Sequence, residues 1–216
     1  MLKNSSGYLI LDTEVCSYKK LFDIAAQAVK LGIDIIQLRD KHGLGKDILN
    51  FSKRLVTLTQ KSQTIFIVND RVDIALAAKA DGVHLGQDDL PLIEARKILK
   101  PQALMGISCQ TLKQALKAQR EGADYIGFGS VFKTLTKPGR NPMDLDLLKR
   151  VIKTVKIPVF AIGGINLTNM VRLKKIGVRR MAVCRVVCES KNLQKTIKEF
   201  QRKIILDADC FCSWLK

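Results

Sequence analysis

The stretch LGIDIIQLR, at residues 31–39, passes from a glycine through a polar residue into β-forming residues and ends on a charge. This pattern is typical of a helix stopped by a C-cap, a short loop and a buried strand. Three further stretches share it: KADGVHLG (79–86), EGADYIGFG (121–129) and IGVRRMAVCR (176–185). Four short apolar runs lie between them: YLILD (8–12), IFIVND (65–70), ALMGIS (103–108) and PVFAIGG (158–164). The chain therefore predicts eight buried strands.

Segments with helical periodicity separate these strands. One spaces Leu21, Ile24, Ala25, Ala28 and Val29, and another spaces Ile48, Phe51, Leu55 and Leu58. Regular alternation of strand and helix indicates a parallel sheet with helices outside it. Eight such units predict a compact α/β fold, the (β/α)8 TIM barrel, with strands starting near residues 8, 34, 65, 82, 104, 124, 158 and 180. An open doubly wound sheet is the alternative, but no G-x-G-x-x-G opens a helix after the first strand.

No linker or change of composition divides the chain, so one domain is predicted over residues 1–216. Between Asn192 and Leu206, one helical face carries Leu193, Ile197, Phe200 and Ile204, which predicts the eighth outer helix. The apolar tail that follows, residues 207–216, would cover the barrel floor or take part in a subunit contact in a homo-oligomer. These two alternatives stay open.

Composition excludes several classes of protein. With 47% apolar and 26% charged residues, the chain is neither disordered nor collagen-like. No apolar run approaches the roughly 18–20 residues of a membrane helix, and Asp12 interrupts the only early apolar stretch. The six cysteines form no C-x-x-C pair, and Cys109, Cys184 and Cys188 are expected to be small buried hydrophobes. We expect a cytoplasmic protein without a membrane partner.

The net charge of +17 favours anionic partners. Nucleic acid is a poor candidate, because aromatic residues are only 6% and no arm or stripe concentrates the charge. Most of the lysines and arginines are expected on solvated helix faces. A solvated surface therefore explains the charge better than a nucleic-acid site does.

Active sites of (β/α)8 barrels lie at the carboxyl ends of the strands. Read only at those ends, the sequence offers a dense set of polar residues: Gln37, Arg39, Lys41, Asn69, Asp70, Gln87, Asp88, Asp89, Ser108, Thr134, Thr136, Lys137, Gly163, Gly164 and Arg185. The spacing of two in Gln37, Arg39 and Lys41 places all three on one face of an extended segment.

Asp70 and Asp89 would stand on neighbouring strand ends. Magnesium usually takes one or two carboxylates together with phosphate oxygens of the substrate. Arg39, Lys41 and Lys137 could meet the same phosphates, and this combination fits the departure of a pyrophosphate leaving group. Gly163 and Gly164 lie where this fold usually binds a monophosphate.

Each element also has a simpler interpretation. Arg39 and Asp40 could form a surface ion pair, and Asp70 and Asp89 could merely cap the helices that follow them. His84, between Val83 and Leu85, is expected in the barrel interior rather than as a base. The joint presence of these groups at strand ends favours a functional site.

Several of these stretches resemble the thiamine-phosphate synthase family. The resemblance spans about 130 residues, and it is carried by these motifs: IIQLRDK (35–41), IVNDRVDIALAAKADGVHLGQDDLP (67–91), GIS (106–108), GADYIGFGSVFKTLTKPGR (122–140) and VFAIGGI (159–165). It implies a single (β/α)8 barrel. It also implies a transferase that couples hydroxymethylpyrimidine diphosphate with hydroxyethylthiazole phosphate, releasing pyrophosphate and giving thiamine phosphate.

The resemblance also implies site residues. The pyrimidine substrate and its diphosphate would meet Gln37, Arg39, Lys41, Asn69, Ser108 and Lys137. Arg39, Lys41, Lys137 and Ser108 are the candidate catalytic residues, and Asp70 and Asp89 would bind the cofactor Mg²⁺. The thiazole phosphate would meet Thr134, Thr136 and Gly164.

Two positions depart from the family pattern, because many relatives carry Ser where this chain has Arg185 and Pro where it has Lys133. The guanidinium of Arg185 would either contact the thiazole phosphate, or point to solvent or pair with an acidic neighbour so that only the backbone N–H of Arg185 serves the phosphate. A related barrel such as a thiazole tautomerase is the alternative function, but it would not need the carboxylates or the cations.

Overall fold

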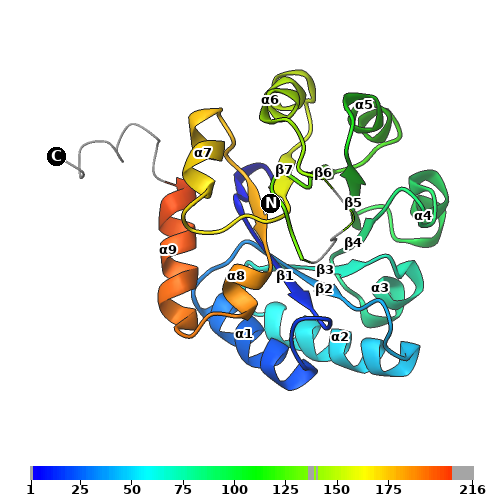
Figure 1. Cartoon of the computed structure of the whole chain (residues 1–216). Coiled ribbons are helices and arrows are strands. Elements are labelled where there is room, and N and C mark those ends of the chain that lie inside the picture. Colours follow the sequence, from blue (N-terminus) through cyan, green and yellow to red (C-terminus); the bar gives the residue numbers. More distant parts are fainter. Residues whose placement is uncertain (1, 136–138, 140, 206–216) are drawn as a thin grey trace.

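The computed structural model describes residues 2–135, 139 and 141–205. Eight parallel strands close into a barrel in which each strand pairs with its neighbours in the sequence and β8 returns to β1 (Figure 1). The strands are β1 (Gly7–Asp12), β2 (Ile35–Arg39), β3 (Ile65–Asn69), β4 (Gly82–Leu85), β5 (Leu104–Cys109), β6 (Tyr125–Gly129), β7 (Val159–Ile162) and β8 (Met181–Val183). The predicted TIM barrel is confirmed, and every predicted strand start lies within one residue of the observed start.

Helices surround the barrel, as Figure 1 shows in a view along its axis. They are η1 (Leu2–Asn4), α1 (Tyr18–Lys30), α2 (Gly45–Thr59), α3 (Val72–Ala78), α4 (Leu92–Ile98), α5 (Leu112–Arg120), α6 (Leu145–Thr154), α7 (Met170–Lys175), α8 (Arg185–Cys188) and α9 (Leu193–Ile205). The predicted last helix corresponds to α9, which buries Ile197, Phe200 and Ile204. The short α8 was not predicted. The apolar tail lies outside the described residues.

Local sequence explains where the helices begin. The Ser17 side chain caps α1 by accepting a hydrogen bond from the backbone N–H of Lys20. Thr111 and Gln114 form a reciprocal capping box at the start of α5. Most of the periodic apolar positions of α1 and α2 are buried in the core, while Val29 and Leu58 are only partly buried. This continuous apolar layer fixes the strands and so fixes the positions of the residues at their ends.

A second apolar cluster fills the lower barrel. It consists of Tyr8, Ile10, Ile35, Ile65, Ile67, Tyr125, Phe160 and Ala182. Because side chains alternate along a strand, the residues two positions after Ile35 and Ile67 also point inward. Those residues are Gln37 and Asn69, both buried. The barrel interior thus changes from apolar to polar toward the carboxyl ends of its strands.

Among residues 2–135, 139 and 141–205, no helix has the length and apolar character to cross a membrane. Within the same residues, Cys16, Cys109 and Cys188 are buried free thiols, and Cys184 is a half-buried one. The expectation of buried cysteines therefore holds for Cys109 and Cys188 and in part for Cys184.

Candidate active site

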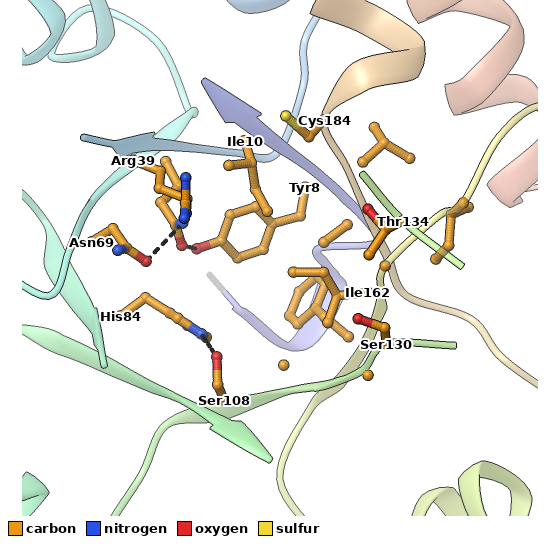
Figure 2. A pocket seen from close by; sticks show the side chains of 18 of the residues that line it. Tyr8, Ile10, Arg39, Asn69, His84, Ser108, Ser130, Thr134, Ile162 and Cys184 are labelled. Carbon is orange, nitrogen blue, oxygen red and sulfur yellow. Dashed lines mark hydrogen bonds between the residues drawn. The ribbon is translucent and has the colours of Figure 1, made fainter. Parts of the chain in front are cut away.

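A cavity of about 450 Å³ opens at the carboxyl ends of the strands. Figure 2 looks into it and shows side chains from several strands converging on its centre. Of the fifteen residues predicted at the strand ends, thirteen line it: Gln37, Arg39, Lys41, Asn69, Asp70, Gln87, Asp88, Asp89, Ser108, Thr134, Gly163, Gly164 and Arg185. The other two, Thr136 and Lys137, lie outside the described residues.

Arg39 is held by two carboxylates. Its Nη1 donates to Asp12 at 2.9 Å and to Glu14 at 3.0 Å. Asp12 is fully buried at the end of β1. Burial alone would disfavour the charge on Arg39, but the two carboxylates outweigh burial and raise its pKa. Arg39 is thus a permanent cation at the cavity wall.

The guanidinium also has an unused donor. Its Nε is buried and has no hydrogen-bond partner in the described part of the chain. A buried donor of this kind is uncommon unless a ligand or water completes it. This favours an anionic ligand next to Arg39.

The alternative of an Arg39–Asp40 surface ion pair is not what the structure contains. Asp40 instead accepts hydrogen bonds from the Tyr18 hydroxyl and from the backbone N–H groups of His42, at 3.1 Å, and Gly43, at 2.7 Å. These bonds close the turn after β2. Lys41 lies in this turn and lines the cavity. The spacing of Gln37, Arg39 and Lys41 predicted the same side for Lys41, but in an extended segment rather than in a turn.

Asp70, Asp89 and Lys41 form a charged cluster at the rim. Lys41 Nζ forms an ion pair with Asp70. The pKa of Asp70 is raised to about 6, first by burial and then by its interaction with Asp89, although Lys41 acts in the opposite direction. Two carboxylates that lie beside each other are oxygen donors of the kind that Mg²⁺ uses in proteins.

Neither carboxylate serves as the helix cap that the sequence also allowed. Arg71 is the N-cap of α3 and Pro91 that of α4, and neither helix has a side-chain capping bond. Asp70 instead has a positive φ of 60°, and its backbone N–H donates to the His84 carbonyl at 2.8 Å. Asp89 accepts from the Gly86 N–H at 2.7 Å. The backbone thus turns both carboxylates toward the cavity.

Asp70 and Asp89 fit a magnesium site in which the substrate supplies the remaining ligands. Among the described residues, no three His, Cys, Asp or Glu side chains come together as a metal cluster. A cation held by Asp70 and Asp89 would therefore need further oxygen ligands, which phosphate groups and water supply in magnesium sites.

Polar side chains form the floor of the cavity. Gln37 Nε2 donates to Asn69 Oδ1 at 3.2 Å, and Ser108 Oγ lies 3.0 Å from His84 Nε2 (Figure 2). His84 is buried in β4, so its expected place in the barrel interior is confirmed. These groups can match hydrogen-bonding edges of a flat ring.

The opposite wall is built on glycine. Gly163 and Gly164 have positive φ values of 102° and 64°. A Cβ on Gly163 would lie 2.6 Å from Ser130 Cβ, and one on Gly164 would lie 2.3 Å from the Lys133 carbonyl oxygen. The backbone after β7 therefore packs directly on the loop after β6, next to Thr134. Only glycine fits at these two positions, because a side chain would collide with the loop after β6.

The similarity of this chain to known proteins extends over the whole barrel. The family model for thiamine monophosphate synthase matches residues 7–187. The chain belongs to this family. The thiamine-phosphate synthase of Fusobacterium nucleatum subsp. nucleatum is 39% identical over 197 residues, which cover 91% of this chain and 96% of that protein. The thiamine-phosphate synthase of Prochlorococcus marinus (strain MIT 9303) is 45% identical over 172 residues, or 80% of this chain and 49% of that longer protein.

A solved structure supports the same assignment. The thiamine phosphate pyrophosphorylase from Pyrococcus furiosus superposes with a TM-score of 0.83 and 36% identity, covering 92% of this chain and 95% of that one. The predicted family is therefore confirmed. The predicted enzyme class, a transferase of the thiamine-phosphate synthase type, is confirmed as well.

In this member of the thiamine monophosphate synthase family, Arg185 has features of both predicted alternatives, because it pairs with an acidic neighbour and also lines the cavity. β8 ends at Val183, and Arg185 begins α8 rather than extending the strand. Its guanidinium forms an ion pair with Glu189, the residue that follows α8, while Arg185 still lines the cavity. The structure thus contains the pairing with an acidic neighbour.

Sequence reasoning missed several residues of this family member's site. Asp12, the buried partner of Arg39, ends an apolar run and gave no motif of its own. Tyr8 and Tyr125 also line the cavity, although their pattern is that of ordinary buried strand residues. Strand parity relative to Gln37 and Ser108 is the signal that could have found both tyrosines.

Proposed function

We propose that this enzyme couples hydroxymethylpyrimidine diphosphate with hydroxyethylthiazole phosphate, giving thiamine phosphate and pyrophosphate in a magnesium-assisted dissociative substitution. One observation carries the proposal. The cations Arg39 and Lys41 and the carboxylates Asp70 and Asp89 converge at one edge of a cavity whose floor is polar and hydrogen-bonding. A diphosphate with its cation at the rim and a flat heterocycle on the floor would fill this arrangement.

The charged rim would bind the diphosphate. Asp70 and Asp89 would hold Mg²⁺, which supplies charge neutralisation at the phosphates as pyrophosphate leaves. Arg39, already positioned by Asp12 and Glu14, stabilises the same developing charge. Lys41 exchanges its contact with Asp70 for one with the diphosphate, and Lys137 is assigned the same task from the motif in which it lies.

The reaction then needs no protein nucleophile. The bond between the methylene carbon and the diphosphate oxygen breaks, and its electron pair leaves with pyrophosphate. The aminopyrimidine ring stabilises the resulting methylene cation. The thiazole nitrogen supplies the electron pair of the new carbon–nitrogen bond, so no proton is removed and no general base is required. The site accordingly works by positioning and electrostatics.

The two substrates occupy different walls. Gln37, Asn69 and Ser108 take the pyrimidine on the floor. Thr134 and Gly164 take the thiazole phosphate at the glycine-built wall, and Thr136 is assigned to the same phosphate from the motif in which it lies.

A coupling assay tests the proposal directly. The purified enzyme is incubated with both substrates and Mg²⁺, and thiamine phosphate and pyrophosphate are quantified together. We expect equal amounts of the two products and none when either substrate is omitted. Failure to form thiamine phosphate under these conditions overturns the proposal. Isomerisation of a thiazole carboxylate phosphate in its place would assign the tautomerase function.

A further inference from the structure

A chain of hydrogen bonds crosses the barrel under the cavity. The Tyr8 hydroxyl donates to Gln37 Oε1 at 2.7 Å and lies 2.9 Å from the Tyr125 hydroxyl. The Tyr125 hydroxyl lies 3.2 Å from His84 Nδ1, and His84 Nε2 lies 3.0 Å from Ser108 Oγ. The chain thus joins Gln37 on β2 with Ser108 on β5. Figure 2 shows Tyr8, His84 and Ser108 around one central space.

Two glycines leave the space that the side chains of this hydrogen-bond network occupy. A Cβ on Gly106 would lie 2.1 Å from the Tyr125 ring and 2.5 Å from His84 Nδ1. A Cβ on Gly127 would lie 3.2 Å from His84 Cε1. Both glycines stand on strands where an inward side chain would displace the imidazole. Tyr8, Tyr125 and His84 are themselves at most 5% exposed, so water does not compete for their hydrogen bonds.

The direction of the hydrogen bonds follows from counting protons. Burial raises the pKa of Tyr8 and of Tyr125 well above the usual range of a tyrosine, so each hydroxyl keeps its one proton. Tyr8 gives its proton to Gln37 Oε1, because a carbonyl oxygen can only accept. Tyr125 must then donate to Tyr8, and its own oxygen must accept from His84 Nδ1.

The direction of these hydrogen bonds also determines the direction of the bond between His84 and Ser108. In a neutral imidazole one nitrogen donates and the other accepts, so Nε2 accepts when Nδ1 carries the proton. The hydroxyl of Ser108 therefore donates to His84 Nε2. Its oxygen keeps lone pairs for the cavity and has no proton to offer there.

We propose that Tyr8, Tyr125 and His84 are positioning residues that fix His84 as the neutral Nδ1–H tautomer and thereby make Ser108 Oγ a hydrogen-bond acceptor toward the substrate. Resting on the proposed function, this predicts that Ser108 recognises an N–H donor on the pyrimidine, such as an exocyclic amino group. A ring that presents an oxygen acceptor at the same place meets the lone pairs of Ser108 and is rejected.

Histidine-selective ¹⁵N NMR tests the proposal without any substrate. The chain has two histidines, so the exposed His42 provides an internal reference beside His84. At about pH 8, above the range in which an unperturbed histidine titrates, His84 should show the Nδ1–H tautomer. Tyr8→Phe should reverse it, because Tyr125 loses its acceptor and turns its proton to Nδ1. Tyr125→Phe should also reverse it, because Nδ1–H then loses the Tyr125 hydroxyl as its acceptor.

Tyr18→Phe is the matched control. It removes the hydroxyl of the third tyrosine of the chain, which contacts Asp40 outside this network, and should leave the His84 signals unchanged. An Nε2–H tautomer, or an imidazolium at this pH, in the unmodified enzyme overturns the proposal. So does an Nδ1–H tautomer that persists in folded Tyr8→Phe and Tyr125→Phe proteins, as judged by circular dichroism.

Kinetics supply the second readout. Tyr125→Phe should raise KM for the pyrimidine diphosphate by roughly threefold to tenfold, the range of one neutral hydrogen bond, and leave KM for the thiazole phosphate unchanged. If the tautomer reverses but KM for the pyrimidine diphosphate does not rise relative to KM for the thiazole phosphate, the direction of the hydrogen bonds is confirmed and the acceptor role of Ser108 is refuted. An inactive unmodified enzyme with the expected NMR result refutes only the proposed function.

Discussion

Gly106 on β5 and Tyr125 on β6 face each other in register and share one volume of the barrel interior. A Cβ on Gly106 would lie 2.1 Å from Cζ of Tyr125, far inside contact distance. The tyrosine ring can occupy the barrel centre only because its strand neighbour has no side chain.

Gly106→Ala is therefore expected to destabilise the fold. The added methyl group must push aside a fully buried ring, and overpacking of this kind typically costs about 1–3 kcal/mol. Urea unfolding measures the change in the free energy of unfolding. Gly139→Ala is the control, because no atom of the described residues lies within 4 Å of a Cβ added at Gly139. Equal stability of the two variants would contradict the assignment of close packing at Gly106.

Replacement of Asp70 or Asp89 by Asn is expected to abolish the dependence of coupling on magnesium together with most of the activity. Either change halves the carboxylate set that would hold the cation. Turnover is measured before and after EDTA treatment and after Mg²⁺ is restored. Full turnover by a folded Asp70→Asn enzyme, or by the EDTA-treated enzyme, would refute the metal assignment.

Arg39 and Asp12 should be energetically coupled. Removing Arg39 alone, as in Arg39→Met, leaves Asp12 buried with its charge poorly compensated, which typically costs about 3–5 kcal/mol. The double replacement Asp12→Asn, Arg39→Met should recover a large part of that stability. Activity should stay low in both variants, because the cation is absent. Additive stability changes in this double-mutant cycle would contradict the coupling.

Because of Asp40, the free energy of unfolding should decrease as the pH becomes acidic. Burial by itself raises its pKa, but the hydrogen bonds from Tyr18 and from the backbone N–H groups of Gly43 and His42 outweigh burial and lower it. Because the folded pKa lies below the unfolded value, the ionised carboxylate stabilises the fold above about pH 4. That contribution is lost as the pH falls through the folded pKa.

Asp40→Asn is accordingly expected to lower the free energy of unfolding at neutral pH by about 1–3 kcal/mol, the range for hydrogen bonds to a charged group. The difference from the unmodified enzyme should shrink as the pH falls below about 4, the ordinary pKa of an aspartate. Denaturant unfolding at a series of pH values measures it. A difference that is independent of pH would show that the charge of Asp40 is not involved.

Arg185→Ser is expected to have small effects. The guanidinium of Arg185 is engaged by Glu189 in a partly exposed pair, and such pairs contribute about 0–1 kcal/mol. KM for each substrate should change by less than about threefold, the equivalent of half a kcal/mol or so. Glu189→Gln is the matched control. A rise of tenfold or more in KM for the thiazole phosphate alone would instead place Arg185 on that phosphate.

The sequence by itself determined the barrel and the edge at which its site lies. Strand and helix periods are local properties, because each follows from which side chains must be buried, and every predicted strand start is within one residue of the structure. Parallel strands also place all their carboxyl ends at one edge, so residues as distant as Gln37 and Ser108 could be assigned to one cavity. The motifs supplied the family.

Only the tertiary structure decided which side chains meet. Arg39 pairs with Asp12 and Glu14 rather than with its neighbour Asp40, and the two tyrosines meet His84 across the barrel. The short α8 likewise turned Arg185 toward Glu189. These outcomes depend on strand register, on inward-facing parity and on the space that Gly106 leaves open. A linear sequence carries no direct signal for such pairings. Several side chains of similar chemistry could pair with each of these groups, and the distances and burial in the folded barrel decide which one does.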